Sequence, residues 1–170
     1  MECAADYFVS SYTPTVGALL AHSPDPSEST HTTSTFKMMV VVQTEELFYA
    51  KKELENIQRY VSSDALVVFG VPGTVANVEI VASSLSEASI VHFACHGKQD
   101  RSKPLDSGLK LHDGLLRLSR IMKETTPHGS LAFLCACETA MGDENLPDEA
   151  MSLGASLLFS GFHSVIATIW

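Results

Sequence analysis

The chain has 170 residues, of which 45% are hydrophobic and 18% are charged. This length and composition fit one globular domain with its own core and exclude a disordered chain. The net charge is −9, and without a basic cluster such a surface would repel a phosphate backbone, so we expect no nucleic-acid partner. No apolar run approaches the roughly 20 residues that cross a bilayer, so we expect no membrane partner either.

The first residues and the cysteines both bear on the compartment. The opening stretch, MECAADYFVSS, lacks the basic start and apolar run of a signal peptide. Three of the four cysteines lie inside strand-like runs, which is unlike the disulfide framework of a small secreted protein. We therefore expect one domain over residues 1–170 in the reducing cytoplasm.

Short apolar runs alternate with amphipathic segments along most of the chain. A polar stretch with two prolines, HSPDPSESTHTTST, comes first and predicts a flexible linker over residues 22–35. The apolar runs that follow predict strands covered on both faces, and segments with apolar residues three or four apart predict helices. The expected strands are 37–42, 65–70, 89–94, 131–137 and 164–169. The expected helices are 44–61 capped by Thr44, 74–88 starting near Thr74, and one from Pro147 to about Ser160 that Gly161 ends.

This alternation predicts an α/β fold with a mostly parallel sheet and helices on both faces. An Asp113-Gly114 pair between alternating residues adds a β-hairpin within 107–121. In open sheets of this kind, ligands bind at the carboxyl ends of the strands. His96 and Cys137 each follow such an end, so the sequence predicts that they belong to one site.

A histidine and a cysteine at neighbouring strand ends suit acyl transfer. The thiolate is the reactive form of cysteine, and a nearby imidazole removes the thiol proton and later protonates the leaving amine. The backbone N–H groups of Gly97 and Cys137 would stabilise the oxyanion, and Gly97 would let the chain turn without a side chain in the way.

The other cysteines and the other histidine of these apolar runs are expected to have structural roles. Strand alternation points Cys95 away from His96 and puts Cys135 deeper in its strand than Cys137, so both are expected to be small buried hydrophobes. His92 is expected to be a structural residue that hydrogen-bonds beneath the site. A zinc site is disfavoured because Cys95 points away from the histidines and the usual ligand spacing is absent, so we expect no metal.

Two motifs resemble a known family. The segments VHFACHG and LAFLCACETA resemble the CHAT domain, a caspase-like cysteine peptidase family often attached to tetratricopeptide repeats. The segment PLDSGLKLHDGLLRLSRI is similar to that family's hairpin and short helix, and LPDEAMSLGASLLFSGFHSVIATIW to its apolar helix and following strand in fungal members. The resemblance implies a caspase-like three-layer α/β/α sandwich, with His96 as catalytic histidine, Cys137 as nucleophile, and Gly97 lining the oxyanion hole.

The sequence also departs from the family pattern. Cys135 and Thr139 stand where caspases have Gln and Gly, and the CHAT family usually has Ser at the position of Cys135. Family members continue past the strand that Trp170 closes, so we expect a C-terminally incomplete copy with little activity of its own.

Two functions follow from the resemblance. The first is a cysteine endopeptidase that needs no cofactor, acts on a peptide or protein substrate, and has the tetratricopeptide-repeat regions of a parent protein as partners. The alternative is a catalytically silent, peptide-binding module of a larger signalling protein.

Overall fold

The computed structural model describes residues 35–43, 47–100, 102–135 and 153–167. All of them belong to the second of the two units into which the chain divides, residues 32–170. Only Thr35 of the predicted linker 22–35 is described, and the helix-start residues Thr44 and Pro147 lie outside the described ranges.

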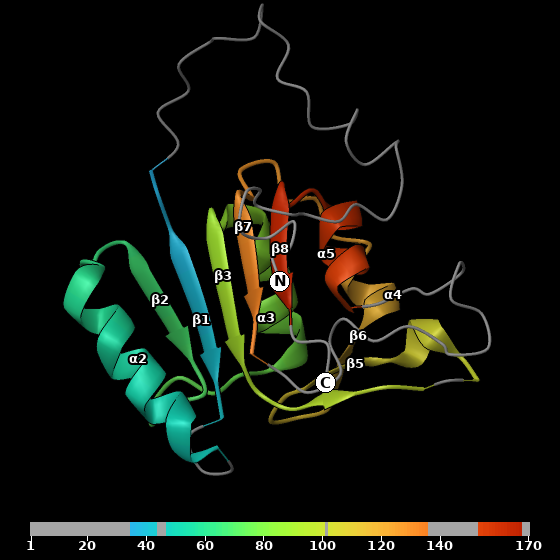
Figure 1. Ribbon diagram of the computed structural model, residues 1–170, viewed down its shortest axis with the longest axis horizontal. Coiled ribbons are helices and arrows are strands. Elements are labelled where there is room, and N and C mark those ends of the chain that lie inside the picture. Colours follow the sequence, from blue (N-terminus) through green and yellow to red (C-terminus); the bar gives the residue numbers. More distant parts are fainter. Residues whose placement is uncertain (1–34, 44–46, 101, 136–152, 168–170) are drawn as a thin grey trace, which may run out of the picture. The chain divides into compact units, whose positions relative to one another are not determined.

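A five-stranded parallel sheet forms the centre of the described structure (Figure 1). Its order is β2-β1-β3-β7-β8. The strands are β1 (Met38–Val42), β2 (Leu66–Phe69), β3 (Ile90–Ala94), β7 (Leu131–Leu134) and β8 (Ser164–Ala167). Each strand lies within a range that the sequence predicted, because short, continuous apolar runs are what a doubly covered parallel sheet requires. The last strand is described as far as Ala167, and β7 ends earlier than predicted, at Leu134.

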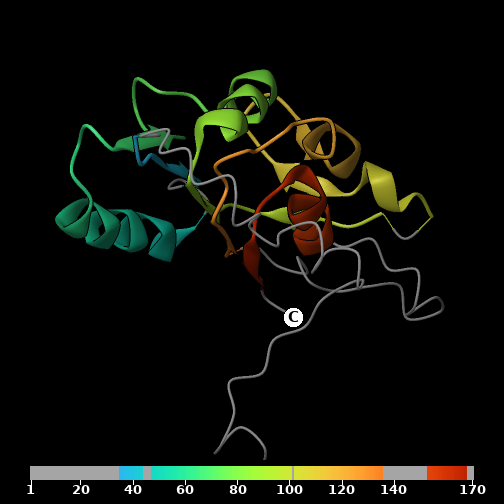
Figure 2. The ribbon, with the colours of Figure 1, turned by 90° about the horizontal axis from the view of Figure 1, so that it is seen from above.

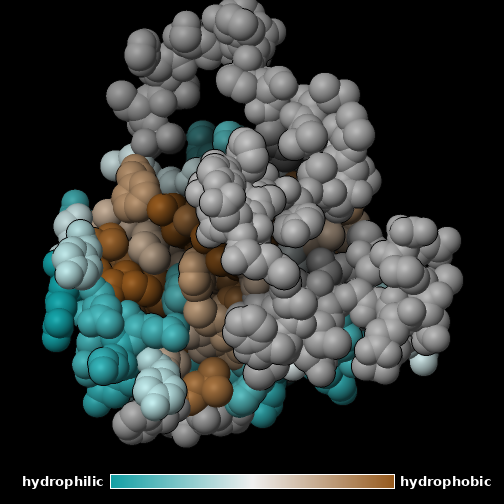
Figure 3. Space-filling view, viewed as in Figure 1, coloured by the Kyte–Doolittle hydropathy of each residue, from teal (hydrophilic) through white to brown (hydrophobic). Residues whose placement is uncertain are grey.

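Helices cover both faces of this sheet, so the predicted three-layer α/β fold is confirmed (Figures 1 and 2). On one face, α2 (Phe48–Tyr60) packs Ala50 and Leu54 against Val40 and Val42 of β1. Figure 3 shows that the side of α2 turned to the viewer is mostly hydrophilic, as expected for the outer face of an amphipathic helix. The other face is covered by α3 (Val78–Ser84), α4 (Leu118–Ile121) and α5 (Leu153–Ser160).

The predicted hairpin is confirmed in a second, smaller sheet. Its antiparallel strands are β4 (Gly97–Lys98), β5 (Gly108–Lys110) and β6 (Leu115–Arg117), with the 3₁₀ helix η3 (Pro104–Asp106) before β5. Asp113 and Gly114 lie in the turn, where the N–H of Leu111 donates to the Gly114 carbonyl at 2.7 Å.

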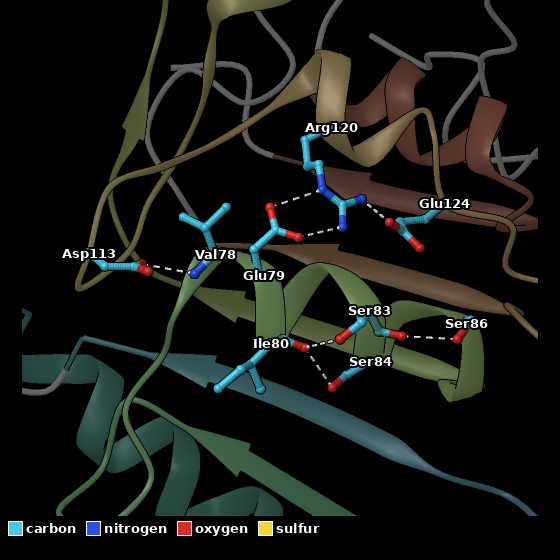
Figure 4. A network of polar contacts seen from close by, with 9 residues as sticks. All are labelled: Val78, Glu79, Ile80, Ser83, Ser84, Ser86, Asp113, Arg120 and Glu124. Carbon is cyan, nitrogen blue, oxygen red and sulfur yellow. Dashed lines mark hydrogen bonds and ion pairs between the residues drawn. The ribbon is translucent and has the colours of Figure 1, made fainter.

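Helix α3 begins at Val78, so the predicted start near Thr74 is wrong. Thr74 instead closes a turn, in which the N–H of Gly70 donates to its carbonyl at 2.7 Å and Gly73 has a φ of +90°. The helix takes its cap from the distant hairpin: the N–H of Val78 donates to Asp113 Oδ1 at 2.8 Å (Figure 4). Sequence patterns did not reveal this start, because the capping residue is remote in the chain.

Three further features complete the α3 side of the sheet. Arg120 of α4 forms an ion pair with Glu79 of α3, with 2.9 Å between Nη2 and Oε2, and also pairs with Glu124 (Figure 4). The 3₁₀ helix η2 (Leu85–Glu87) continues α3 toward β3. Helix α5 is mostly buried and ends before Gly161 as predicted, although Phe159 is 53% exposed.

Within the described ranges, no helix is both long and apolar enough to span a membrane.

Candidate active site

The strand order marks one particular edge of the sheet as the expected place for a ligand. From β1 the chain passes through α2 to β2 on one side, and through α3 it returns to β3 on the other side of β1. The direction in which the chain crosses the sheet thus reverses between β1 and β3. The loops that follow two such strands turn in opposite directions, and ligands bind between them. Gln43 follows β1 and His96 follows β3 at this point.

The backbone of His96 is held from two sides. Its N–H donates to Gln43 Oε1 at 2.8 Å, and its carbonyl accepts from the N–H of Lys110 at 2.8 Å. Gln43 is itself fixed, because its N–H donates to the carbonyl of Ala94 at 3.0 Å. The half-buried His96 is therefore anchored to both β1 and the hairpin. Gln43 was not predicted from the sequence, where its one signal is that it is the first polar residue after the apolar run of β1.

Gly97 begins β4 directly after His96. It is half-buried and pairs with Leu109 of β5. The hairpin therefore fixes the direction in which the chain leaves the histidine. This location agrees with the predicted turn at the strand end, but the oxyanion role of Gly97 stays a prediction.

Cys137, the predicted nucleophile, lies outside the described residues, so the pairing of His96 with Cys137 stays a prediction as well. The described part of this segment ends at Cys135, whose N–H donates to the carbonyl of Phe93 at 2.8 Å. Cys135 therefore follows β7 directly beside the end of β3.

Cys95 is buried as predicted. It is 1% exposed and belongs to the core under α3, together with Val91 and Phe93. Burial raises the pKa of its thiol to about 12, because a charged thiolate is costly away from water. Cys95 is therefore a protonated, unreactive thiol at neutral pH.

The prediction that Cys135 is a small buried hydrophobe is wrong. Its side chain is half-buried on the α2 face and hydrogen-bonds to Glu53. Desolvation raises the pKa of this thiol to about 11, and the carboxylate of Glu53 adds to the shift through its charge and its hydrogen bond. Strand alternation could not show which side chain of α2 lies opposite Cys135.

His92 is buried and hydrogen-bonded, as predicted. It is 8% exposed, its Nε2 lies 3.0 Å from Glu53 Oε2, and its ring stacks on Phe133 with 5.3 Å between the ring centres. Glu53 therefore contacts both His92 and Cys135. Glu53 was not predicted from the sequence, because a glutamate on an amphipathic helix is ordinarily a solvated surface residue.

The comparison with protein families gives one match. The CHAT domain model matches residues 8–170, which is nearly the whole chain. The chain belongs to the CHAT domain family. The family resemblance and the caspase-like α/β fold expected from the two motifs are therefore confirmed. No curated protein matches this CHAT domain.

A depression at the opposite edge of the sheet carries none of this chemistry. It has a volume of about 300 Å³ and is lined by Lys37, Met38 and Glu87, among others. These residues lie at or near the amino ends of β1 and β3, whereas His96 follows the carboxyl end of β3. The candidate active site of this CHAT domain is accordingly the edge where β1 and β3 end.

Proposed function

We propose that this CHAT domain is a cysteine endopeptidase in which Cys137 is the nucleophile and His96 the general base and acid. The register of two strands supports the proposal. Strands β3 and β7 are adjacent and parallel, with Phe93 opposite Leu134. His96 is three positions beyond Phe93, and Cys137 is three positions beyond Leu134. Because the two residues are equally far from a pair of neighbouring strand positions, we expect the side chains of His96 and Cys137 to lie close together at the carboxyl edge of the sheet.

The proposed reaction uses groups of the chain alone. His96 takes the proton of the Cys137 thiol, and the thiolate attacks the carbonyl carbon of a peptide bond. The N–H groups of Gly97 and Cys137 donate to the oxyanion. His96 then gives its proton to the departing amine, which leaves a thioester on Cys137. Water, activated by His96, hydrolyses the thioester and regenerates the thiol.

The anchoring of His96 fits this role. A general base must keep its ring in place while substrate binds and leaves. Two hydrogen bonds, from the His96 N–H to Gln43 Oε1 and from the Lys110 N–H to the His96 carbonyl, restrict the motion of the residue without using its imidazole. Gln43 is thus a positioning residue in the proposal.

A thiol-directed electrophile with a peptide leader tests the dyad on the chain as it stands. We expect labelling of Cys137, no labelling in Cys137→Ala, and markedly slower labelling in His96→Ala, because the thiol would lose its base. His112→Ala is the matched control, since this exposed histidine lies in the hairpin turn region. Equal labelling rates in His96→Ala and the wild type would rule out the dyad.

The proposed substrate is a peptide or protein, and the proposed partners are tetratricopeptide-repeat regions of a parent protein. Free thiols at Cys95 and Cys135 favour a reducing compartment, so we place the domain in the cytoplasm.

A peptide library distinguishes the peptidase from the catalytically silent interaction module. Cleavage that requires Cys137 supports the peptidase, whereas saturable peptide binding without cleavage, unchanged in Cys137→Ala, would support a silent interaction module.

A further inference from the structure

Three potential metal ligands from three separate elements converge on the α2 face of the sheet. They are Glu53 of α2, His92 of β3 and Cys135, which directly follows β7. Their ligand atoms all lie within 4.8 Å of one another. Among the described residues, no other group of three or more His, Cys, Asp or Glu side chains is as closely spaced. From it, we infer that Glu53, His92 and Cys135 form a Zn²⁺ site that the proposed peptidase function does not use.

The geometry is close to what zinc requires. With bonds of about 2.0–2.3 Å in a tetrahedral arrangement, neighbouring ligand atoms lie about 3.3–3.8 Å apart. His92 Nε2 and Glu53 Oε2 are 3.0 Å apart, and no separation in the group exceeds 4.8 Å. Small side-chain rotations would therefore create the coordination, and the side chain of Glu53, which is 38% exposed, has room to make them.

The ligand types select the metal. A thiolate and an imidazole together suit Zn²⁺, whereas Ca²⁺ and Mg²⁺ require oxygen ligands. Three protein ligands leave a fourth position for water, which is the pattern of open zinc sites. On binding, the thiol proton of Cys135 would pass to solvent, and His92 would coordinate through Nε2, the ring nitrogen that lies 3.0 Å from Glu53 Oε2.

The surroundings of the three side chains are suitable for such a site. His92 is buried and its ring is fixed against Phe133, so one ligand is already oriented. Cys135 and Glu53 are only half-buried, which leaves a path for the ion. In the metal-free state, the carboxylate of Glu53 contacts both other ligands, and the metal would replace these hydrogen bonds.

This inference revises the sequence-based expectation of no metal. That expectation relied on Cys95 pointing away from the histidines, and Cys95 does belong to the opposite core. The site instead draws its third ligand from helix α2, which spacing within the strand motifs cannot reveal. Cys135, which directly follows β7, supplies the sulfur.

Binding of Co²⁺ and Zn²⁺ to the whole chain, without a histidine tag and stripped of metal, tests the inference. We expect Co²⁺ to give a thiolate-to-cobalt charge-transfer band and the visible bands of tetrahedral cobalt, and one equivalent of Zn²⁺ to displace it. Cys135→Ser should lose the charge-transfer band. Because losing even an outer partner of a metal site costs about 10–100-fold in affinity, Glu53→Gln and His92→Gln should each weaken Zn²⁺ binding by at least about tenfold.

Control variants separate this site from the proposed active site. Glu55→Gln removes a neighbouring exposed carboxylate of α2 and should leave the band unchanged, as should Cys137→Ser and His96→Ala. A wild-type protein without a charge-transfer band would overturn the inference. So would a band that survives in Cys135→Ser, or one that disappears in Cys137→Ser and therefore belongs to the proposed dyad. Circular dichroism of each variant without metal checks that a lost band is not due to unfolding.

Discussion

The two faces of the parallel sheet are packed in different ways. Among the described residues, the core under α3, α4 and α5 contains 21 buried residues, whereas the core under α2 contains five. The larger core is apolar and includes Cys95 as a protonated thiol. Beside the smaller core lie three polar side chains that contact one another, Glu53, His92 and Cys135.

The difference between the two faces follows from the direction in which successive side chains of a strand point. Strand alternation sends odd-numbered residues of β3 to the α3 side and even-numbered ones to the α2 side. The α3 side can therefore be filled with large apolar side chains while the α2 side keeps polar groups near the carboxyl edge. Substitutions on the two sides should have correspondingly different effects.

The largest effect is expected for Phe93→Ala. Phe93 is fully buried in the α3-side core, and truncating such a side chain removes its transfer free energy and leaves a cavity. We expect the free energy of unfolding to fall by about 3–5 kcal/mol, measured by chemical denaturation. A loss below about 1 kcal/mol would mean that this face does not dominate stability.

Leu54→Ala tests the opposite face and should cost less. Leu54 is 6% exposed and packs in the small α2-side core, where the neighbouring helix can settle toward the sheet. We expect a loss of about 2 kcal/mol, near the lower end for a buried leucine. If Leu54→Ala proves as damaging as Phe93→Ala, the proposed division between the two faces fails.

The buried thiol of Cys95 gives the α3 side a specific pH dependence. Its pKa is raised from 9.0 to about 12 in the folded chain, so above pH 9 the unfolded state ionises while the folded state stays neutral. The unfolded state then binds fewer protons, and stability falls as pH rises, by on the order of 1–2 kcal/mol near pH 10.

Cys95→Ala removes this particular dependence. Between about pH 7 and pH 10, the wild type should therefore lose on the order of 1–2 kcal/mol of unfolding free energy more than Cys95→Ala loses. Val91→Ala truncates a neighbour in the same core and should show a difference that does not vary with pH. A constant difference for Cys95→Ala would contradict the burial of its thiol.

Local patterns predicted most of the sheet because a doubly covered strand needs a continuous apolar run. The same logic located His96 at the end of β3, and the Asp113-Gly114 pair located the hairpin turn. Two errors have a common physical origin. The start of α3 depends on Asp113, and the environment of Cys135 depends on Glu53. In both cases the deciding partner is brought in by tertiary packing, and neither periodicity nor spacing contains that information.

The smallest effect is expected for Asp113→Ala, which tests one of these tertiary contacts. The substitution removes the acceptor for the Val78 N–H and leaves the start of α3 without its cap. For this exposed position we expect a loss of about 0.5–1 kcal/mol, with Asp64→Ala, another exposed aspartate, as the matched control. Hydrogen exchange at the first amides of α3 should quicken, while exchange in α2 stays unchanged because its packing is on the opposite face of the sheet. Unaltered exchange at Val78 would show that the hairpin does not hold the helix, and the start of α3 would then need another cause.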